Sequence, residues 1–410
     1  MGFQQGLSGL NASAKALDAI GNNVANSGTV GFKSARGEFA DVFAASLAGA
    51  GASQIGIGTA VANVAQQFTQ GNITVSNNAL DVAINGGGMF IMSNNGAISY
   101  SRNGQFQIDK SGYIINAAGY RLQGYPADFT VDPAGIIVQS TPTDIYIDPS
   151  DLTPKTTDSI TVGLNLDSRE SVPVPAFSRS DPLSYNSSTS VTVYDSLGVP
   201  QVVTMYFRKA AANSWDIYYR VTGPQITVPV DLGPDNLNFT STGGTTGTTT
   251  FTQAGINTGT GANPMAFDID FGGSTQFGST FGVTQMIQNG FSSGRLAGVN
   301  ISPDGVVQGR FTNGQSRNMG QITLAKFNNP NGLLSIGGNQ WQETSESGAP
   351  LVGAPGTGSN GVVQSAAVEE SNVDLTAELV NMITQQRAYQ ANAQSIKTQD
   401  QILQTLVNLR

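Results

Sequence analysis

The sequence predicts a mainly β protein with α-helical termini, in which two nested all-β domains are bracketed by N- and C-terminal coiled-coil helices. Near both ends, apolar residues recur at alternating steps of four and three, the a/d spacing of a coiled coil. Between the ends, short alternating apolar runs are separated by Gly, Asn and Asp turns, which is typical of all-β domains. Glycine accounts for 50 of the 410 residues, well above the usual share of about 7%, so many tight turns are expected.

The N-terminal helix is expected over residues 1–25. Three glycines inside it each cost roughly 1 kcal/mol relative to alanine, and a helix of this length is marginal in water. We therefore expect it to become ordered only when its apolar stripe is buried against a partner. That stripe consists of Phe3, Leu7, Leu10, Ala14, Leu17, Gly21 and Val24.

A run rich in Gly, Asn and Ser ends this helix, and residues 26–71 are predicted to be a connecting region. The first β domain is expected to be discontinuous, with residues 72–147 joined by residues 288–360. Within it, Gly86, Gly87 and Gly88 predict a turn, and Asn103-Gly104 between Tyr100 and Phe106 predicts a hairpin. The return of strand patterns after residue 288 indicates that a second, outer β domain is inserted at residues 148–287.

The C-terminal helix is expected within residues 361–410, capped by Asn372 or Asp374. Its stripe consists of Leu375, Leu379, Met382, Gln386, Tyr389, Ala393, Ile396, Asp400, Leu403 and Val407. The two terminal helices can zip together within one chain, or they can pack against other copies. Polar residues at two seam positions, Gln386 and Asp400, favour a wet or polymeric environment over a dry dimer.

Composition excludes most chemistry. The formal charge of −9, with no basic cluster, argues against nucleic-acid binding, which depends on Lys and Arg at the phosphates. The absence of cysteine and histidine removes thiolate nucleophiles, the usual general base near neutral pH and the commonest metal ligands. No cofactor and no enzymatic activity are therefore expected. The N-terminus does not resemble a cleaved signal peptide, and no apolar run is long enough for membrane insertion.

One acidic pair requires an explicit choice. Asp268 and Asp270 alternate with Phe267, Ile269 and Phe271, so both carboxylates lie on one face of a predicted strand. Paired carboxylates can hydrolyse glycosides. The ordinary interpretation is a half-exposed strand whose aromatic and aliphatic residues point inward.

The terminal motifs resemble those of the axial proteins of the bacterial flagellum, the family of rod and hook subunits. Residues 11–33 (NASAKALDAIGNNVANSGTVGFK) carry the N-terminal signature, and residues 370–410 carry its C-terminal counterpart. The signature positions are Asn22, Asn23, Asn26, Gly31, Phe32 and Lys33. In the middle of the chain, YSRNGQF (100–106), SVTVYDS (190–196) and GQITLAKF (320–327) resemble the hook branch of the family.

This resemblance implies a structural subunit that assembles helically with copies of itself into the curved, flexible joint between the basal-body rod and the filament. It implies export through the flagellar type III apparatus without cleavage of a signal peptide, and an extracellular location. Other implied partners are the distal rod, hook cap and hook–filament junction proteins. The expected polymerisation interface consists of Phe3, Leu7, Leu10, Leu17, Val24, Leu375, Leu379, Met382, Tyr389, Ile396, Leu403 and Val407.

Two alternatives remain at this point. A distal rod protein has similar termini but is usually shorter and lacks the inserted outer domain. A secreted β-rich carbohydrate-binding protein or enzyme would use Asp268 and Asp270.

Overall fold

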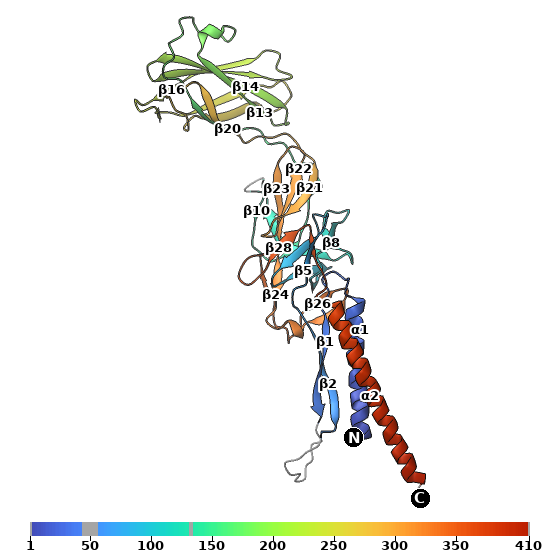
Figure 1. Ribbon diagram of the computed structural model, residues 1–410. Coiled ribbons are helices and arrows are strands. Elements are labelled where there is room, and N and C mark those ends of the chain that lie inside the picture. The colour runs from blue at the N-terminus through green and yellow to red at the C-terminus, as the bar shows by residue number, and fades with distance from the viewer. Residues whose placement is uncertain (1, 43–55, 131–133, 409–410) are drawn as a thin grey trace. The chain divides into compact units, whose positions relative to one another are not determined.

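The computed structural model describes residues 2–42, 56–130 and 134–408, with helices at the two ends and strands between them (Figure 1). The predicted fold class is confirmed. The chain divides into two compact units. Unit 1 comprises Met1–Asp148, Gly298–Arg310 and Ser316–Arg410, and unit 2 comprises Pro149–Ala297 and Phe311–Gln315. Unit 2 thus extends beyond the predicted boundary at residue 287, and it takes in a short return segment. None of the described helices is apolar over a stretch long enough to cross a lipid bilayer.

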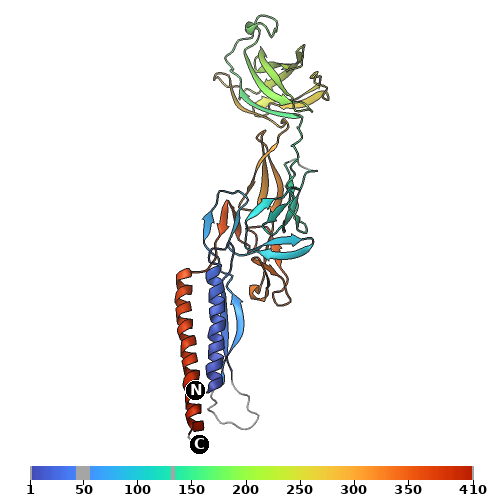
Figure 2. The same cartoon turned by 90° about the vertical axis from the view of Figure 1, so that its right-hand side faces the viewer.

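The two helices of unit 1, α1 (Phe3–Ala25) and α2 (Leu375–Asn408), lie side by side (Figures 1 and 2). Asp374 caps α2, as expected, because its Oδ1 accepts hydrogen bonds from the amides of Thr376 and Ala377 at 2.9 and 3.1 Å. The 34 residues of α2 give it a length of about 51 Å. Strands, and no helix, occupy residues 362–369, because the heptad pattern begins only at Leu375.

The predicted connecting region contains a β-hairpin. Strands β1 (Ala35–Val42) and β2 (Gly58–Gln66) pair antiparallel, from Ala35 opposite Gln66 to Val42 opposite Gly58. Most of their side chains are exposed. No apolar alternation was therefore required of the sequence, and the strand signal is missing for that reason.

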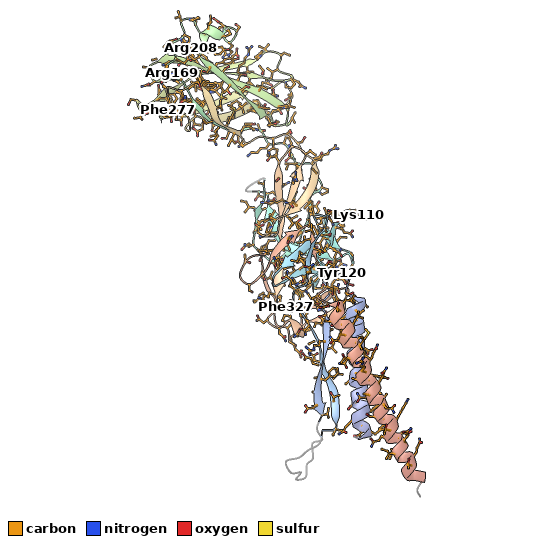
Figure 3. The ribbon with its side chains drawn as sticks, in the orientation of Figure 1. Lys110, Tyr120, Arg169, Arg208, Phe277 and Phe327 are labelled. Atoms are coloured by element: carbon orange, nitrogen blue, oxygen red, sulfur yellow. The ribbon has the colours of Figure 1, made fainter. Side chains whose placement is uncertain are left out.

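The main sheet of unit 1 has the strand order β21-β22-β23-β9-β5-β6-β26-β25. The strands of this path are β5 (Met89–Asn94), β6 (Ala97–Ser101), β9 (Arg121–Asp128), β21 (Leu296–Ile301), β22 (Val306–Phe311), β23 (Ser316–Ile322), β25 (Leu334–Gly337) and β26 (Gln340–Gln342). Shorter strands attached to it are β7 (Phe106–Ile108), β8 (Ile114–Asn116), β10 (Ile136–Ile137), β11 (Thr143–Asp144), β24 (Leu324–Lys326) and β27 (Leu351–Gly353). Tyr100 packs edge-to-face on Phe327, which is labelled in Figure 3, in a core shared with Trp341.

The two ends of unit 1 are tied together by two further strand pairs. Strand β28 (Val362–Ser365) pairs with β4 (Val82–Asn85), and β29 (Ala367–Glu369) pairs with β3 (Ile73–Val75). The last strands of the chain therefore pair with the first strands after the β1–β2 hairpin. Because of these pairs, the C-terminal end of α1 and the N-terminal end of α2 lie at the same part of the unit.

The hairpin predicted at Asn103-Gly104 is wrong. Strand β6 pairs with β5 and β26, and β7 pairs with β8, so the strands flanking this dipeptide do not pair with each other. Gly104 is required for a different reason, since a Cβ atom there would overlap the carbonyl oxygen of Val82. The glycines at 86–88 do form the expected turn, with positive φ at Gly86 and Gly88.

Unit 2 consists of two sheets that share one apolar core. The first sheet has the order β18-β19-β12-β20, and the second has the order β13-β14-β15-β16-β17. The bounds are β12 (Ser159–Asn165), β13 (Ser187–Tyr194), β14 (Pro200–Ala211), β15 (Ser214–Thr222), β16 (Val230–Phe239), β17 (Thr245–Thr246), β18 (Thr250–Ile256), β19 (Met265–Asp270) and β20 (Gly282–Gln288). A short 3₁₀ turn spans Pro182–Ser184 here, and another spans Pro330–Gly332 in unit 1.

Strict alternation explains the core of unit 2. In β14 and β15, every second residue is buried, as expected for strands with one face inward. Phe207, Trp215 and Tyr219 are completely buried, and Arg208, labelled in Figure 3, comes from the opposite face of β14. One loop is fastened by Asp195, whose carboxylate accepts hydrogen bonds from the amides of Leu197 and Val199 and from the hydroxyls of Thr258 and Thr260.

Candidate assembly interface

The helices α1 and α2 pack antiparallel along a stripe of mostly small residues. A Cβ atom on Gly6 would lie 3.0 Å from Cγ1 of Ile396, and one on Gly9 would lie 2.8 Å from Nδ2 of Asn392. At the other end, Asn23 contacts Glu378. The stripe on α1 consists of Gly6, Gly9, Ser13, Ala16, Ile20 and Asn23, of which Gly6, Ser13, Ala16 and Asn23 are buried.

This small-residue stripe has the same alternating spacing as the predicted one but is displaced from it by one residue. Glycine at positions 6 and 9 lets the two backbones approach closely, because no side chain separates them. The glycines that weaken α1 as an isolated helix therefore have a packing role. The sequence analysis found the correct period, and the contact within the chain uses the neighbouring face of α1.

The predicted interface residues mostly lie outside this intramolecular contact. Phe3 is 50% exposed and Leu7 is 43% exposed, while Leu10, Leu17 and Val24 are half-buried. On α2 the exposed members are Leu375, Leu379, Tyr389 and Leu403, and the half-buried members are Met382 and Ile396. The side chain of Val407 lies outside the described residues.

Further apolar residues of α2 are exposed beside that stripe. Val380 is 58% exposed and Ile383 is 52% exposed, and Ile402 is similar. The sequence analysis missed them because it followed a single a/d seam, although a wider apolar face was visible from their spacing to Leu379 and Met382. Exposed apolar side chains clustered in this way are typical of an interaction surface.

The signature asparagines join α1 to the β part of unit 1. Nδ2 of Asn23 donates to the carbonyl of Ala35, and its Oδ1 accepts from the Ala35 amide, both at 2.8 Å. Nδ2 of Asn26 donates to the carbonyl and the side-chain oxygen of Asn22 at 3.0 and 2.7 Å, which closes the end of the helix. These residues therefore fix how β1 leaves α1.

The signature residues Gly31, Phe32 and Lys33 lie in the turn that follows. Gly31 has a φ of +72°, and a Cβ atom there would lie 2.6 Å from the amide nitrogen of Asn103. Its own amide donates to the carbonyl of Glu369 at 2.8 Å. Phe32 is half-buried and its amide donates to Thr29. A residue with a side chain cannot replace Gly31 without displacing this turn.

Lys33 belongs to a buried ion cluster that the sequence analysis missed. Nζ of Lys33 donates to Oε1 of Glu369 at 2.7 Å, and Nη1 of Arg102 donates to Oε2 at 3.1 Å. The side chains of Lys33 and Glu369 are completely buried. Burial lowers the pKa of Lys33, and the nearby carboxylate of Glu369 opposes that shift. One carboxylate thus joins the turn after α1, the main sheet and the segment before α2.

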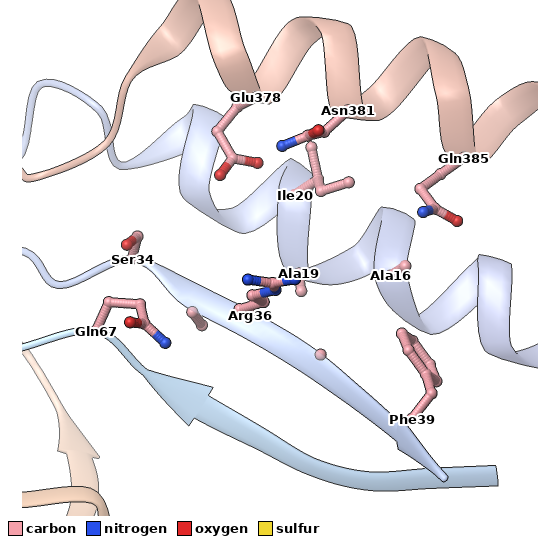
Figure 4. Close-up of a pocket in the computed structure, with 12 residues that line it drawn as sticks. Ala16, Ala19, Ile20, Ser34, Arg36, Phe39, Gln67, Glu378, Asn381 and Gln385 are labelled. Carbon is pink, nitrogen blue, oxygen red and sulfur yellow. The ribbon is translucent and has the colours of Figure 1, made fainter. Parts of the chain in front are cut away.

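A groove of about 600 Å³ lies between α1, α2 and β1, and we call it the root groove. It is lined by Ala16, Ala19, Ile20, Ser34, Ala35, Arg36, Gly37, Phe39, Gln67, Glu378, Asn381 and Gln385. Figure 4 shows Glu378, Asn381 and Gln385 on α2 directed toward α1 and β1. Apolar residues of α1 and charged residues of β1 and α2 therefore share one concave surface.

The alternative acidic site in unit 2 has the geometry of an ordinary strand. Phe267, Ile269 and Phe271 are buried, as the simpler interpretation expected. Asp268 accepts a hydrogen bond from Thr252 at 2.6 Å, and Asp270 accepts one from the amide of Gly272 at 2.9 Å. Within the described ranges, no group of three acidic side chains is placed to hold a metal ion.

Four family models match successive parts of the chain. They are the flagella basal body rod protein at residues 3–33, the flagellar hook protein FlgE/F/G D1 domain at residues 83–164, the flagellar basal body protein FlaE D2 domain at residues 165–291 and the flagellar basal body rod FlgEFG protein C-terminal at residues 364–409.

Curated relatives match over their full length. The chain is 42% identical over 415 residues to the flagellar hook protein FlgE of Escherichia coli K12 and 43% identical over 418 residues to that of Salmonella typhimurium, covering 100% of each chain. It is 32% identical to the hook protein of Borreliella burgdorferi, covering 99% of this chain and 98% of that one. The crystal structure of Helicobacter pylori hook protein FlgE2 has a TM-score of 0.54 at 15% identity, covering 72% of this chain and 100% of that one, which shows a shared fold.

Proposed function

Because the chain belongs to the flagellar hook protein family and is a structural subunit of the hook, we propose that its copies assemble helically through the exposed stripes of α1 and α2. The observation that carries this proposal is the position of Leu7 and Leu379. Both are bulky, apolar and exposed, on helices that already contact each other through a different, small-residue stripe.

The energetic argument is direct. Full burial of a Leu or Phe side chain stabilises by about 1.5–3 kcal/mol relative to exposure. In the single chain, Phe3, Leu7, Leu375 and Leu379 realise only part of this stabilisation, because each is 43–50% exposed. Copies that cover both stripes would remove this area from water, and the hollow, curved joint between rod and filament is the assembly that the family implies.

The other parts of the proposal follow from the family. We propose the distal rod, hook cap and hook–filament junction proteins as neighbours, and the flagellar type III apparatus as the export route, without cleavage of a signal peptide. The rod alternative is less favoured, because the relatives that match along the whole chain are hook proteins. The carbohydrate-active alternative has no support, since these relatives are structural proteins and not enzymes.

The test is the substitution Leu379→Asp in the full-length chain. Leu379 is exposed, so the substitution should leave the β units folded and abolish tube formation, because a buried unpaired charge in an assembled interface is costly. Sedimentation and electron microscopy measure assembly, and circular dichroism measures folding. Gln390→Asp is the matched control, since it adds the same charge at an exposed polar position of α2. Normal tubes from the Leu379→Asp chain would refute the assigned stripe.

A further inference from the structure

The root groove contains an acidic group that the single chain does not satisfy. Oε2 of Glu378 is inaccessible to solvent, and no described residue donates a hydrogen bond to it. Oε1 has one long contact, to Nδ2 of Asn23 at 3.4 Å. A buried carboxylate oxygen without a donor is strongly unfavourable. The groove therefore lacks a cationic or hydrogen-bond-donating partner at this point.

The same groove contains an exposed cationic side chain. Arg36 lines it from β1 (Figure 4), and among the described residues its guanidinium has no ion-pair partner. A matching occupant must therefore bring a cation to Glu378 and an anion to Arg36. It must also bring apolar surface to Ala19 and Ile20, which line the groove.

The distal half of α2 has this combination. Lys397 and Asp400 are exposed and three residues apart, so they are neighbours on one helix face. Asp400 accepts a hydrogen bond from Gln404 at 2.9 Å, and neither Lys397 nor Asp400 forms an ion pair with another described residue. Leu403 and Ile402, close to this pair, are more than 50% exposed and supply the apolar surface.

The occupant cannot be the same molecule. Lys397 follows Glu378 by 19 residues in one continuous helix, a separation of about 28 Å. A straight helix cannot bring these two positions together. We therefore propose that the root groove of one copy holds the distal half of α2 from a second copy, with Lys397 at Glu378 and Asp400 at Arg36.

The contact joins two different surfaces, the root groove of one copy and the distal half of α2 of another. Two copies joined in this way therefore still have one unoccupied root groove and one unbound distal half of α2. Heterologous contacts of this kind generate helical arrays when the rotation between successive copies does not close into a ring. The inference rests on the proposed assembly and adds to it a direction, from the distal end of one helix pair to the root of the next.

A charge-exchange experiment on the full chain tests it. Glu378→Lys and Lys397→Glu should each raise the critical concentration for assembly roughly tenfold, which corresponds to about 1.4 kcal/mol. The double variant E378K/K397E restores the pair in the opposite sense and should assemble within about threefold of the unchanged chain. Failure of the double variant to recover would overturn the proposal, provided that circular dichroism shows folded β units.

Two further comparisons test the groove contact separately from the proposed assembly through the apolar stripes of α1 and α2. The exchange R36D/D400R tests the second ion pair without touching Glu378, and recovery relative to its single variants is expected here too. The mismatched variant E378K/R387E should not recover, because Arg387 lies elsewhere on α2, and recovery equal to that of E378K/K397E would overturn the assignment to Lys397. If Glu378→Lys and Lys397→Glu assemble normally while Leu379→Asp does not, the groove contact is wrong and assembly through the apolar stripes is retained.

Discussion

Unit 2 and the helix pair of unit 1 use their apolar side chains in opposite ways. In unit 2, two sheets enclose a core in which Phe207, Trp215 and Phe271 are completely buried. In the helix pair, small residues form the contact, and Leu7 and Leu379 stay exposed. Because hydrophobic stabilisation scales with the apolar area removed from water, we infer that unit 2 is stable as a single chain and that the helix pair is completed by assembly.

A buried ion cluster lies where α1 ends and α2 begins. Lys33, Arg102 and Glu369 come from three distant parts of the sequence and are buried together. Buried ion pairs contribute little net stability compared with apolar packing, but breaking one is strongly destabilising. Their value here is positional, since the cluster determines where both helices leave the sheet.

The largest stability effect is expected at this cluster. Glu369→Gln keeps the shape of the side chain and leaves two buried cations without a carboxylate, which should lower the free energy of unfolding of unit 1 by about 5 kcal/mol. Unit 2 should be unaffected, and denaturant unfolding followed at each unit measures both effects. Glu370→Gln is the control, because Glu370 is exposed and, among the described residues, its carboxylate has one hydrogen bond, from Nδ2 of Asn72 at 3.4 Å. Equal stability of the two variants would show that the ion pairs of Glu369 do not stabilise unit 1.

A somewhat smaller effect is expected in the core of unit 2. Phe207→Ala removes a completely buried ring that contacts Phe271 and Phe281 and should cost unit 2 about 4 kcal/mol. Leu7→Ala removes an exposed side chain and should leave monomer stability nearly unchanged while weakening assembly. If Leu7→Ala instead destabilised the monomer by a similar amount, the contrast between the two regions would fail.

The smallest effect concerns the loop of unit 2 that Asp195 fastens. Burial by itself raises the pKa of Asp195, but hydrogen bonds from Thr260, Val199, Leu197 and Thr258 outweigh it and hold that pKa below its usual 3.8. The stabilisation is therefore present above pH 3.8 and is lost as the pH falls through the lowered folded-state pKa. Asp195→Asn should cost about 2 kcal/mol at neutral pH and flatten the acid dependence of unfolding.

The control for this experiment is Asp268→Asn. Asp268 is exposed and hydrogen-bonds to Thr252 on the neighbouring strand, so the substitution should change the stability of unit 2 by less than about 0.5 kcal/mol. A steep acid transition that persists in Asp195→Asn would assign the pH sensitivity to another carboxylate.

Local patterns predicted the elements whose burial is periodic. The heptad spacing located both helices, and strict alternation located β14, β15 and β19. Strands β1 and β2 were missed because most of their side chains are exposed, and exposed side chains impose no apolar period. The turn at Asn103-Gly104 was assigned to a hairpin because a dipeptide carries no information about which strands pair.

By itself, the sequence determined the fold class, the two terminal helices and the apolar residues available to an interface, because helix and strand periods are local properties of the chain. Only the tertiary structure decided which face of α1 meets α2. Two stripes with the same spacing lie one residue apart on that helix, and their periodicity is identical. Steric approach separates them, since Gly6 and Gly9 admit Ile396 and Asn392 where Leu7 and Leu10 would not. Long-range pairing likewise decided that Glu369 meets Lys33 and Arg102.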